Sequence, residues 1–306
     1  MKDPFLLHIF NPTKNVSPFD VNMAYEAEFD GVIPYADVNL EDVHTLTQDT
    51  IFSRGPTGVK RTGIFIGGRE FGLALDMLHR ARAAMVPPFE VSVFADPSGA
   101  ITTAAALVAC AEAWLKRKTG KSLEGMNVHI FGGTGPVGIC AGILTAGCGA
   151  NVFLGSHRGK RISQEVADEY NKRFDVHMQG EDFGSAKSIH KSLEIADMVM
   201  GTAKAGIQIL SKAHLKQAQR MVVAADVNAV PPLGIEGIDI NDMGKVLEFT
   251  PNKAFGIGAL AIGNIKYKVH HRLFEMMKTS KLPLYLDQVQ AFAVARKFAA
   301  QYASKK

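Results

Sequence analysis

Apolar and polar positions along this chain alternate in the way expected of strands and helices in turn. In the first hundred residues, short apolar runs predict strands at residues 5–10, 32–34, 50–52, 63–66 and 91–94. Between the last two runs, residues 69–85 have the periodicity of an amphipathic helix, which Pro87-Pro88 would end. Residues 1–100 are therefore predicted to form an N-terminal α/β domain.

A second series of elements begins with a long alanine-rich helix predicted over residues 101–118. Apolar runs after it predict strands at residues 128–131, 152–154, 176–178, 198–200 and 221–225, with helical segments between most of them. Strands that alternate with helices indicate a parallel sheet covered on both faces. We expect an α/β protein of two domains, 1–100 and 101–306. Helices near the C-terminus would brace the cleft between them.

The most informative motif lies in the first strand–helix–strand unit of the second domain. The first apolar run leads into Gly133-Thr134-Gly135-Pro136-Val137-Gly138, and a helical run of small residues follows. This order is the context in which GxGxxG binds a dinucleotide. Gly133 would make the tight turn, Gly135 would leave room for a pyrophosphate, and Gly138 would let the helix pack closely. Residues 101–306 are therefore predicted to be a Rossmann-type domain, with phosphates held at the helix start.

The end of the second strand of this unit indicates which dinucleotide is bound. An NAD site usually carries an acidic residue there, bonded to the ribose 2′-hydroxyl. This chain has no acid there and reads Ser156-His157-Arg158-Gly159-Lys160-Arg161. A hydroxyl and guanidinium groups suit a 2′-phosphate, so Ser156, His157, Arg158 and Arg161 predict an NADP-type site. A solvated basic loop that opens the next helix is the alternative.

Two later strands end in small and polar residues. Thr202 and Ala203 follow one of them, and Asp226 and Asn228 follow the next. Ligands of a parallel sheet lie outside the carboxyl ends of its strands, so these four residues are predicted to lie near the nicotinamide. Small residues after a strand are also ordinary turn chemistry.

Composition narrows the class of protein. The chain has 306 residues, 47% of them hydrophobic and 21% charged, which indicates a folded enzyme-sized protein and neither disorder nor a membrane span. The net charge of +4 does not call for nucleic acid. Three scattered cysteines predict no disulfide framework and fit a reducing cytoplasm. No HExxH and no metal-spaced His/Cys cluster is present, so we expect no metal.

Several strings outside the glycine motif make the pattern specific. They are Ser17-Pro18-Phe19-Asp20, Thr102-Thr103-Ala104, residues 225–239, residues 256–260 and, around Lys266, residues 263–270. Together with the glycine motif, they make the chain resemble the NAD(P)-dependent methylene-tetrahydromethanopterin dehydrogenases of methylotrophic bacteria, nearly end to end. A generic Rossmann domain would not account for these strings.

The resemblance implies an oxidoreductase of one-carbon (formaldehyde oxidation) metabolism. Hydride would pass from the methylene bridge of a reduced pterin to NADP, or to NAD, to give the methenyl form. It also implies a cytoplasmic homo-oligomer, a trimer or hexamer. Asp20, Lys266 and His270 would be the catalytic residues, and Phe19, Thr102 and Thr103 would contact the substrate.

Each of these residues also has a simpler interpretation. Asp20 could be an acid at a helix start, and the two threonines could cap a helix. Lys266 could extend to solvent from an apolar helix face, and His270, four residues later, could be a surface residue. Phe19 could belong to the core.

Other functions remain open at this stage. Another two-domain dehydrogenase of the shikimate or folate type, including a methylene-tetrahydrofolate dehydrogenase, would share the nucleotide half. A non-catalytic NADP-binding sensor would keep the fold without needing Asp20 or Lys266. Folate enzymes that also hydrolyse the methenyl product carry a Tyr-x-x-x-Lys pair, and no lysine stands at that spacing near Tyr25. Cyclohydrolase activity is therefore not expected.

Overall fold

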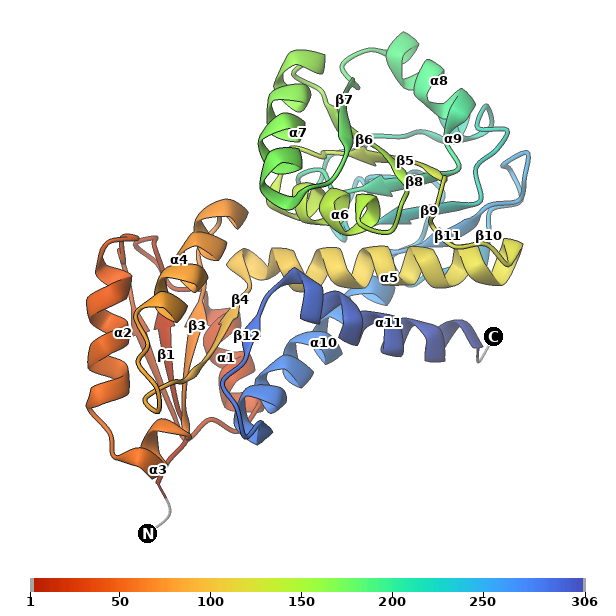
Figure 1. Ribbon diagram of the computed structural model, residues 1–306. Helices are drawn as coiled ribbons and strands as arrows, with labels where there is room; N and C mark the ends of the chain where they lie inside the picture. Colours follow the sequence, from red (N-terminus) through yellow and green to blue (C-terminus); the bar gives the residue numbers. More distant parts are fainter. Residues whose placement is uncertain (1–2, 305–306) are drawn as a thin grey trace. The chain divides into compact units, whose positions relative to one another are not determined.

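The computed structural model describes residues 3–304, which divide into two compact units. Of the described residues, 3–102 and 267–291 form the first unit, and 103–266 and 292–304 form the second. The chain first passes from one unit to the other after Thr102, two residues beyond the predicted boundary at residue 100. The predicted boundaries did not include the return of residues 267–291 to the first unit. Each unit therefore contains two separate pieces of the chain (Figure 1).

The first unit is built on a parallel sheet. Its strands are β1 (Leu6–Phe10), β2 (Gly31–Tyr35), β3 (Thr62–Ile66), β4 (Ser92–Ala95) and β12 (Tyr285–Leu286), in the order β12-β4-β3-β1-β2. Every residue of β3 and β4 is buried, as expected where both faces of a parallel sheet are covered. The chain forms β2 on one side of β1 and then crosses to form β3 on the other side. The carboxyl ends of β1 and β3 therefore mark the switch point of this sheet.

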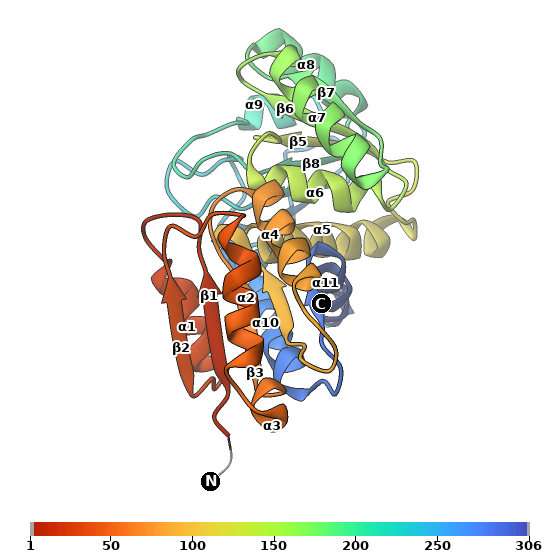
Figure 2. The ribbon, with the colours of Figure 1, turned by 60° about the vertical axis from the view of Figure 1, so that its left-hand side comes forward.

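Helices cover both faces of this sheet (Figure 1, Figure 2). They are α1 (Pro18–Glu26), α2 (Asp42–Phe52), α3 (Pro56–Val59), α4 (Phe71–Ala83) and α10 (Ala259–Thr279), which enters from the second unit. Helices α2 and α4 pack together on one face, whereas α10 lies beside α1. The Lys278 ammonium, near the end of α10, donates to the carbonyl of Ala27, 2.7 Å away.

One predicted strand is a helix in the structure. Residues 50–52 contain β-branched and aromatic side chains, but they form the end of α2. The buried residues of this helix are Val43, Thr47, Thr50 and Ile51, a spacing that places them on one helix face. The longer periodicity therefore overrides the preference of a three-residue run.

The second unit contains a seven-stranded sheet in the order β10-β11-β9-β8-β5-β6-β7. Its strands are β5 (Asn127–Phe131), β6 (Asn151–Ser156), β7 (Met178–Asp182), β8 (Met198–Gly201), β9 (Val223–Asp226), β10 (Met243–Val246) and β11 (Phe255–Ile257). All neighbours are parallel except β10 and β11. The order reverses between β5 and β8, which is the Rossmann arrangement. The α/β prediction with a Rossmann-type sheet is confirmed.

The helices of the second unit follow from this connectivity. They are α6 (Pro136–Ala146), α7 (Lys160–Phe174), α8 (Ala186–Ile195) and α9 (Lys212–Leu215). Most of α5 (Ala100–Thr119) and most of α11 (Gln288–Ser304) also belong to this unit. A short 3₁₀ turn, Pro97–Gly99, precedes α5. Right-handed crossovers place α6 and α7 on one face and α8 on the other, as Figure 1 shows. Residues 97–119 are long and apolar enough to cross a membrane, but 78% of the most apolar window is buried, as in a core helix.

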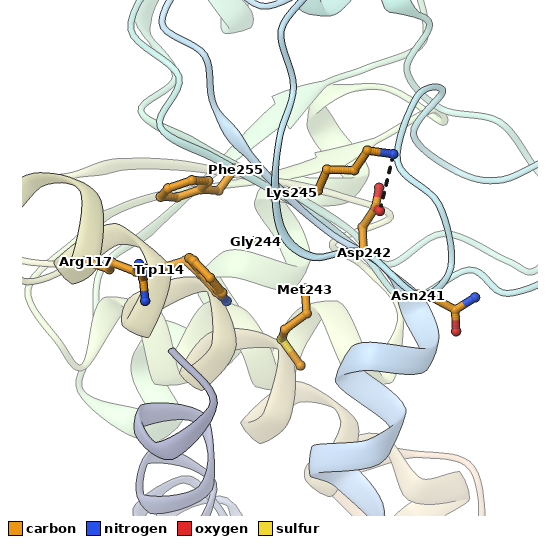
Figure 3. A pocket seen from close by; sticks show the side chains of 8 residues that line it. All are labelled: Trp114, Arg117, Asn241, Asp242, Met243, Gly244, Lys245 and Phe255. Carbon is orange, nitrogen blue, oxygen red and sulfur yellow. Dashed lines mark ion pairs between the residues drawn. The ribbon is translucent and has the colours of Figure 1, made fainter. Parts of the chain in front are cut away.

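Helix α5 packs against the β10 edge of this sheet through Trp114, the one tryptophan of the chain (Figure 3). Its ring centroid lies 5.0 Å from that of Phe255. Gly244 has φ +73°, and a Cβ there would lie 2.3 Å from the indole. The strand register shifts at this glycine, and a cavity of about 410 Å³ opens beside it, with Asn241 among its lining residues.

Candidate functional site

The glycine turn between β5 and α6 is shaped by contacts with two neighbouring strands. Gly132 has φ +78°, and a Cβ there would lie 2.6 Å from the backbone of Ala203. The Gly133 N–H donates to the Gly155 carbonyl at 3.0 Å, and a Cβ on Gly133 would lie 3.0 Å from Leu154 Cα. The left-handed residue of the turn is therefore Gly132, whereas the sequence assigned the tight turn to Gly133, whose lack of a side chain instead lets the turn lie against β6.

The other two glycines of the motif have different environments. A Cβ on Gly138 would lie 2.6 Å from Gly133 Cα, so only glycine allows α6 to approach the turn this closely. A Cβ on Gly135 would meet only the Gly132 carbonyl, at an ordinary 3.6 Å. Helix α6 begins at Pro136, which has no N–H to leave unpaired, and Val137 and Gly138 present first-turn N–H groups. The open space over Gly135 suits a phosphate at this helix start.

A cavity of about 560 Å³ lies at the carboxyl ends of β5, β6, β7 and β8. Among its lining residues are seven that the sequence predicted: Thr134, Gly135, Ser156, His157, Arg158, Thr202 and Ala203. Lys204 also lines it, in the loop that begins with Thr202 and Ala203. The lining residues without a sequence prediction are Phe131, Gly132, Phe183, Ile189, Ile207, Gln208 and Ile209. Phe131, Gly132 and Phe183 lie at or just beyond a strand end, so the carboxyl-end rule that found Thr202 could have found these three as well.

Stacked aromatic rings form part of the cavity wall. The rings of Phe131 and Phe183 are nearly parallel, with centroids 3.9 Å apart. Gly155 makes this possible, because a Cβ there would lie 1.8 Å from the Phe183 ring. The wall therefore offers a flat apolar surface of the kind that receives a planar ring.

His129 lies behind this wall in the core of the sheet. Its ring is fully buried and stacks on Phe153 at 4.4 Å, and within residues 3–304 neither ring nitrogen has a hydrogen-bond partner. Burial lowers the pKa of His129 from 6.5 to about 4. The imidazole is therefore neutral in the folded protein at neutral pH.

This histidine predicts a loss of stability in mild acid. Below pH 6.5, His129 is protonated in the unfolded chain but stays neutral in the folded protein down to about pH 4. The free energy of unfolding therefore falls as the pH falls through that window. Between pH 7 and pH 5, His129 should remove about 2 kcal/mol from the free energy of unfolding. Urea denaturation of His129→Leu should show a pH loss smaller by that amount. Identical pH slopes in both proteins would contradict this assignment.

The basic loop after β6 has one residue turned away from the cavity. The buried hydroxyl of Ser156 accepts a hydrogen bond from the Arg158 N–H at 3.1 Å, which fixes the turn where Arg158 reaches the cavity. Arg161 is 78% exposed, forms an ion pair with Glu165 one helical turn later, and is not among the cavity-lining residues. The local i, i+4 pairing explains why this arginine points elsewhere.

Asp226 and Asn228 support the loops instead of lining the cavity. Both are buried, and Asp226 accepts hydrogen bonds from the N–H groups of Asn228 and Ile235. Burial raises the pKa of Asp226, and these backbone hydrogen bonds partly offset that rise. Neither residue is among those that line this cavity, and their predicted place near the nicotinamide stays a prediction.

In the first unit, side-chain oxygens converge at the β1/β3 switch point. Asn11 follows β1, and its amide nitrogen donates to the Thr13 carbonyl and hydroxyl, which fixes the loop that leads into α1. A Cβ on Gly67, the residue after β3, would lie 3.2 Å from Asn11 Oδ1 and 3.4 Å from Asp20 Oδ2. Asp20, in the first turn of α1, thus has its carboxylate at the edge where ligands of parallel sheets bind.

A buried cluster lies at the end of β4. Asp96 accepts hydrogen bonds from the Thr102 hydroxyl at 2.6 Å and from the Thr102 N–H at 3.1 Å. Its Oδ2 also lies 3.1 Å from His270 Nδ1, and all three side chains are fully buried. Ser98, which lies between Asp96 and Thr102 in the sequence, has the left-handed φ of +51°. Such backbone strain is typical of ligand sites.

Comparison with known proteins decides the family. The sequence model for the N-terminal domain of methylene-tetrahydromethanopterin dehydrogenase matches residues 18–98. The NAD(P)-dependent methylenetetrahydromethanopterin dehydrogenase of Methylorubrum extorquens is 44% identical over 290 residues, covering 95% of this chain and 97% of that protein. The chain belongs to the methylene-tetrahydromethanopterin dehydrogenase family. The resemblance inferred from the sequence is confirmed.

More distant proteins share parts of this pattern. The bifunctional protein MdtA of the same organism is 32% identical over 274 residues, covering 88% of this chain and 92% of that protein. Among solved structures, the NAD-dependent malic enzyme of Thermotoga maritima aligns with 96% of this chain and 84% of its own, with a TM-score of 0.51 and 14% identity. The malic enzyme of Entamoeba histolytica gives a TM-score of 0.50 at 12% identity, covering 98% of this chain and 76% of its own. These two structures share the fold.

For this member of the dehydrogenase family, the remaining predicted residues fall in three settings. Phe19 is 41% exposed, and its ring meets that of His270 edge-on at 5.7 Å. His270 itself is enclosed by Phe65, Phe94 and Phe274, so its ring belongs to the core and not to an open surface. Lys266 is half-buried one turn earlier on α10, and Thr103 is half-buried in α5. Within residues 3–304, no cluster of His, Cys, Asp or Glu could hold a metal.

Proposed function

We propose that this protein transfers a hydride from the methylene bridge of methylene-tetrahydromethanopterin to NADP, giving the methenyl form, with NAD as a weaker acceptor. The near full-length match to the dehydrogenase of Methylorubrum extorquens carries this proposal. The cavity at the glycine turn supports it, because its volume of about 560 Å³ lies within the range of cofactor sites.

The lining of this cavity fits the parts of NADP. First-turn N–H groups of α6 would hold the pyrophosphate over Gly135. Phe183, Ile189 and Ile207 offer apolar surface for the adenine. Arg158 would bind the 2′-phosphate, and none of the described lining residues is acidic, so nothing there repels it.

The chemistry requires positioning more than acid–base catalysis. Bound NADP supplies the hydride acceptor. The methylene carbon of the substrate lies between two nitrogens, whose lone pairs stabilise the cation that forms, so no proton has to move. The residues that hold the pterin must place its carbon about 3–3.5 Å from the nicotinamide, the kind of alignment that supplies much of a rate enhancement.

We assign the pterin to the carboxyl edge of the first unit's sheet. Asp20 would accept hydrogen bonds from the amino and ring N–H groups of the pterin, and Phe19 would pack on its ring. Thr103 would contact the substrate from the start of α5, beside Thr102. His270 and Thr102 would act through Asp96, whose carboxylate they orient. Lys266 would orient the substrate, because a cation beside a developing cation does not stabilise it.

Two finer parts of the proposal concern the cellular setting. We propose a cytoplasmic homo-oligomer, a trimer or hexamer. Within residues 3–304, Cys110, Cys140 and Cys148 form no disulfide, which suits a reducing compartment. Burial raises the pKa of Cys110 to about 12, so this thiol stays protonated and unreactive.

The test is anaerobic turnover of methylene-tetrahydromethanopterin and of methylene-tetrahydrofolate, each with NADP and with NAD, followed by absorbance of the reduced nicotinamide. A higher kcat/KM for the methanopterin substrate with NADP is expected. Equal use of the folate would remove recognition of the methanopterin tail from the proposal. Nucleotide binding without turnover of either pterin would overturn the assignment as a dehydrogenase and leave an NADP-binding sensor.

The NADP preference rests on Arg158 and can be tested separately. Arg158→Ala should raise KM for NADP about 10-fold, the value of one exposed charge-assisted hydrogen bond, and leave KM for NAD within about twofold. Arg161→Ala is the matched control, and its ion pair with Glu165 predicts a smaller effect. Equal losses for NADP and NAD in Arg158→Ala would place this arginine away from the 2′-phosphate.

A further inference from the structure

The loop after β8 forms a large part of the nucleotide cavity. Thr202, Ala203, Lys204, Ile207, Gln208 and Ile209 all line it, whereas Ala205 and Gly206 do not. Gly206 has the left-handed φ of +77°, so the loop turns there. The wall therefore consists of two short stretches on either side of Ala205 and Gly206, which are not among the lining residues.

Both ends of this loop are fixed by backbone hydrogen bonds to the loop after β9. At its start, the Val227 N–H donates to the Gly201 carbonyl at 3.1 Å. At its end, the N–H groups of Ile209 and Leu210 donate to the Gly234 carbonyl at 2.8 and 3.0 Å. Between these ends, the Ile207 N–H donates to the Lys204 carbonyl at 3.3 Å, so the middle of the loop, around Gly206, is a local turn that none of these bonds joins to the second loop.

The side chain of Asn228 reaches that middle. Asn228 Oδ1 accepts hydrogen bonds from the Gly206 N–H at 3.1 Å and from the Val230 N–H at 2.9 Å. Asn228 Nδ2 donates to the Pro232 carbonyl at 3.0 Å, and the residue is 5% exposed. The amide oxygen thus joins the two loops, while the amide nitrogen fixes the Asn228 side chain within its own loop.

We propose that Asn228 is a positioning residue for the dinucleotide: it holds the loop of residues 202–209 in the shape that receives the cofactor, without touching it. This inference rests on the nucleotide site assigned above. A loop held in place before binding loses less conformational entropy when the ligand arrives, so affinity rises. The 2′-phosphate is assigned to Arg158 and not to this loop, so the benefit should extend to both NADP and NAD.

The test is direct binding of NADP and of NAD to the apoprotein, measured by calorimetry. Asn228→Ala should raise the Kd of both nucleotides about 10-fold, with kcat at saturating cofactor within about twofold. Asn228→Asp keeps the acceptor for Gly206 and should restore affinity to within about threefold of the wild type. Asn241→Ala, at the separate cavity beside Trp114 in Figure 3, is the matched control and should bind as the wild type does.

The outcomes separate this inference from the proposed function. A wild type that binds neither nucleotide removes the nucleotide site itself. A wild type that binds both, with Asn228→Ala unchanged, overturns only the positioning role. Weakened binding of NADP alone would also overturn it, because that pattern indicates contact with the 2′-phosphate.

Hydrogen exchange of the wild type gives a second test that needs no variant. The Gly206 amide should exchange slowly in the apoprotein, because Asn228 Oδ1 holds it before the cofactor binds. Rapid exchange of this amide without NADP, with protection appearing only on binding, would overturn the inference. In Asn228→Ala, residues 204–209 should exchange faster than in the wild type.

Discussion

Replacing Asp20 with Asn is expected to lower kcat/KM for the pterin substrate about 100-fold, while the Kd of NADP stays within about twofold. Asn has the same shape but carries no charge, and one of its two polar atoms can only donate. Hydrogen bonds from the amino and ring N–H groups of the pterin to a carboxylate contribute about 1.5–3 kcal/mol each, and about 2.7 kcal/mol corresponds to a factor of 100. Steady-state kinetics with varied pterin, together with calorimetry of NADP, provides the measurement.

The matched control for this variant is Asp42→Asn. Asp42 is also an acid in the first turn of a helix, and its carboxylate accepts the Asn39 N–H at 2.9 Å. Asn keeps an oxygen that can accept this bond but loses the negative charge at the helix start, so stability should fall by about 0.3–1 kcal/mol and the kinetics should stay unchanged. If both variants lose only stability, Asp20 is a helix-start acid and the pterin must be held by other groups.

Gly132→Ala is expected to weaken NADP binding at least about 100-fold and to lower the free energy of unfolding by about 3 kcal/mol. A left-handed φ costs an alanine about 1–2 kcal/mol. The new Cβ would lie 2.6 Å from the Ala203 backbone, so the turn and the loop after β8 must separate, at about 1–3 kcal/mol. Both segments line the nucleotide cavity, so its shape is lost with them. Calorimetry with NADP and urea denaturation measure the two effects.

Gly125→Ala separates strain from the clash. Gly125 has φ +70°, but nothing lies within 4 Å of a Cβ built there. This variant should lose about 1 kcal/mol of stability and bind NADP as the wild type does. Equal losses of affinity in both variants would mean that backbone strain, and not contact with Ala203, accounts for the effect of Gly132→Ala.

The second unit was largely predictable from the sequence because its signals are local. The glycine turn, the strand before it and the basic loop after β6 lie within about 35 consecutive residues, and their roles follow from backbone geometry. The structure moved the left-handed position from Gly133 to Gly132, a distinction that depends on φ and not on residue type. In the structure Arg161 forms an ion pair with Glu165. Two exposed residues one turn apart on a helix can form such a pair, which the basic loop sequence after β6 does not predict.

The first unit was less predictable because its contacts are distant in sequence. The pattern of residues 3–102 does not reveal that β12 adds a strand beside β4, or that His270 enters its core next to Asp96. The sequence indicated a catalytic residue at His270, or a surface residue as the alternative, and not a core residue, since periodicity gives the face of a helix but not what that face packs against. Asn11 gave no sequence signal, and its place at the switch point is visible only once β1 and β3 are paired.

The route of the chain also has a consequence for synthesis. The strand that completes the first sheet, β12, and the helix that fills its core, α10, come from the last 48 residues, counted from Ala259 to Lys306. On the ribosome, β1 to β4 emerge early but lack these partners, while all seven strands of the nucleotide unit are already made before α10. The half that we assign to the pterin is therefore begun first, but its sheet is completed only after the sheet of the second unit. Until β12 is made, the side of β4 with which it pairs remains an open sheet edge.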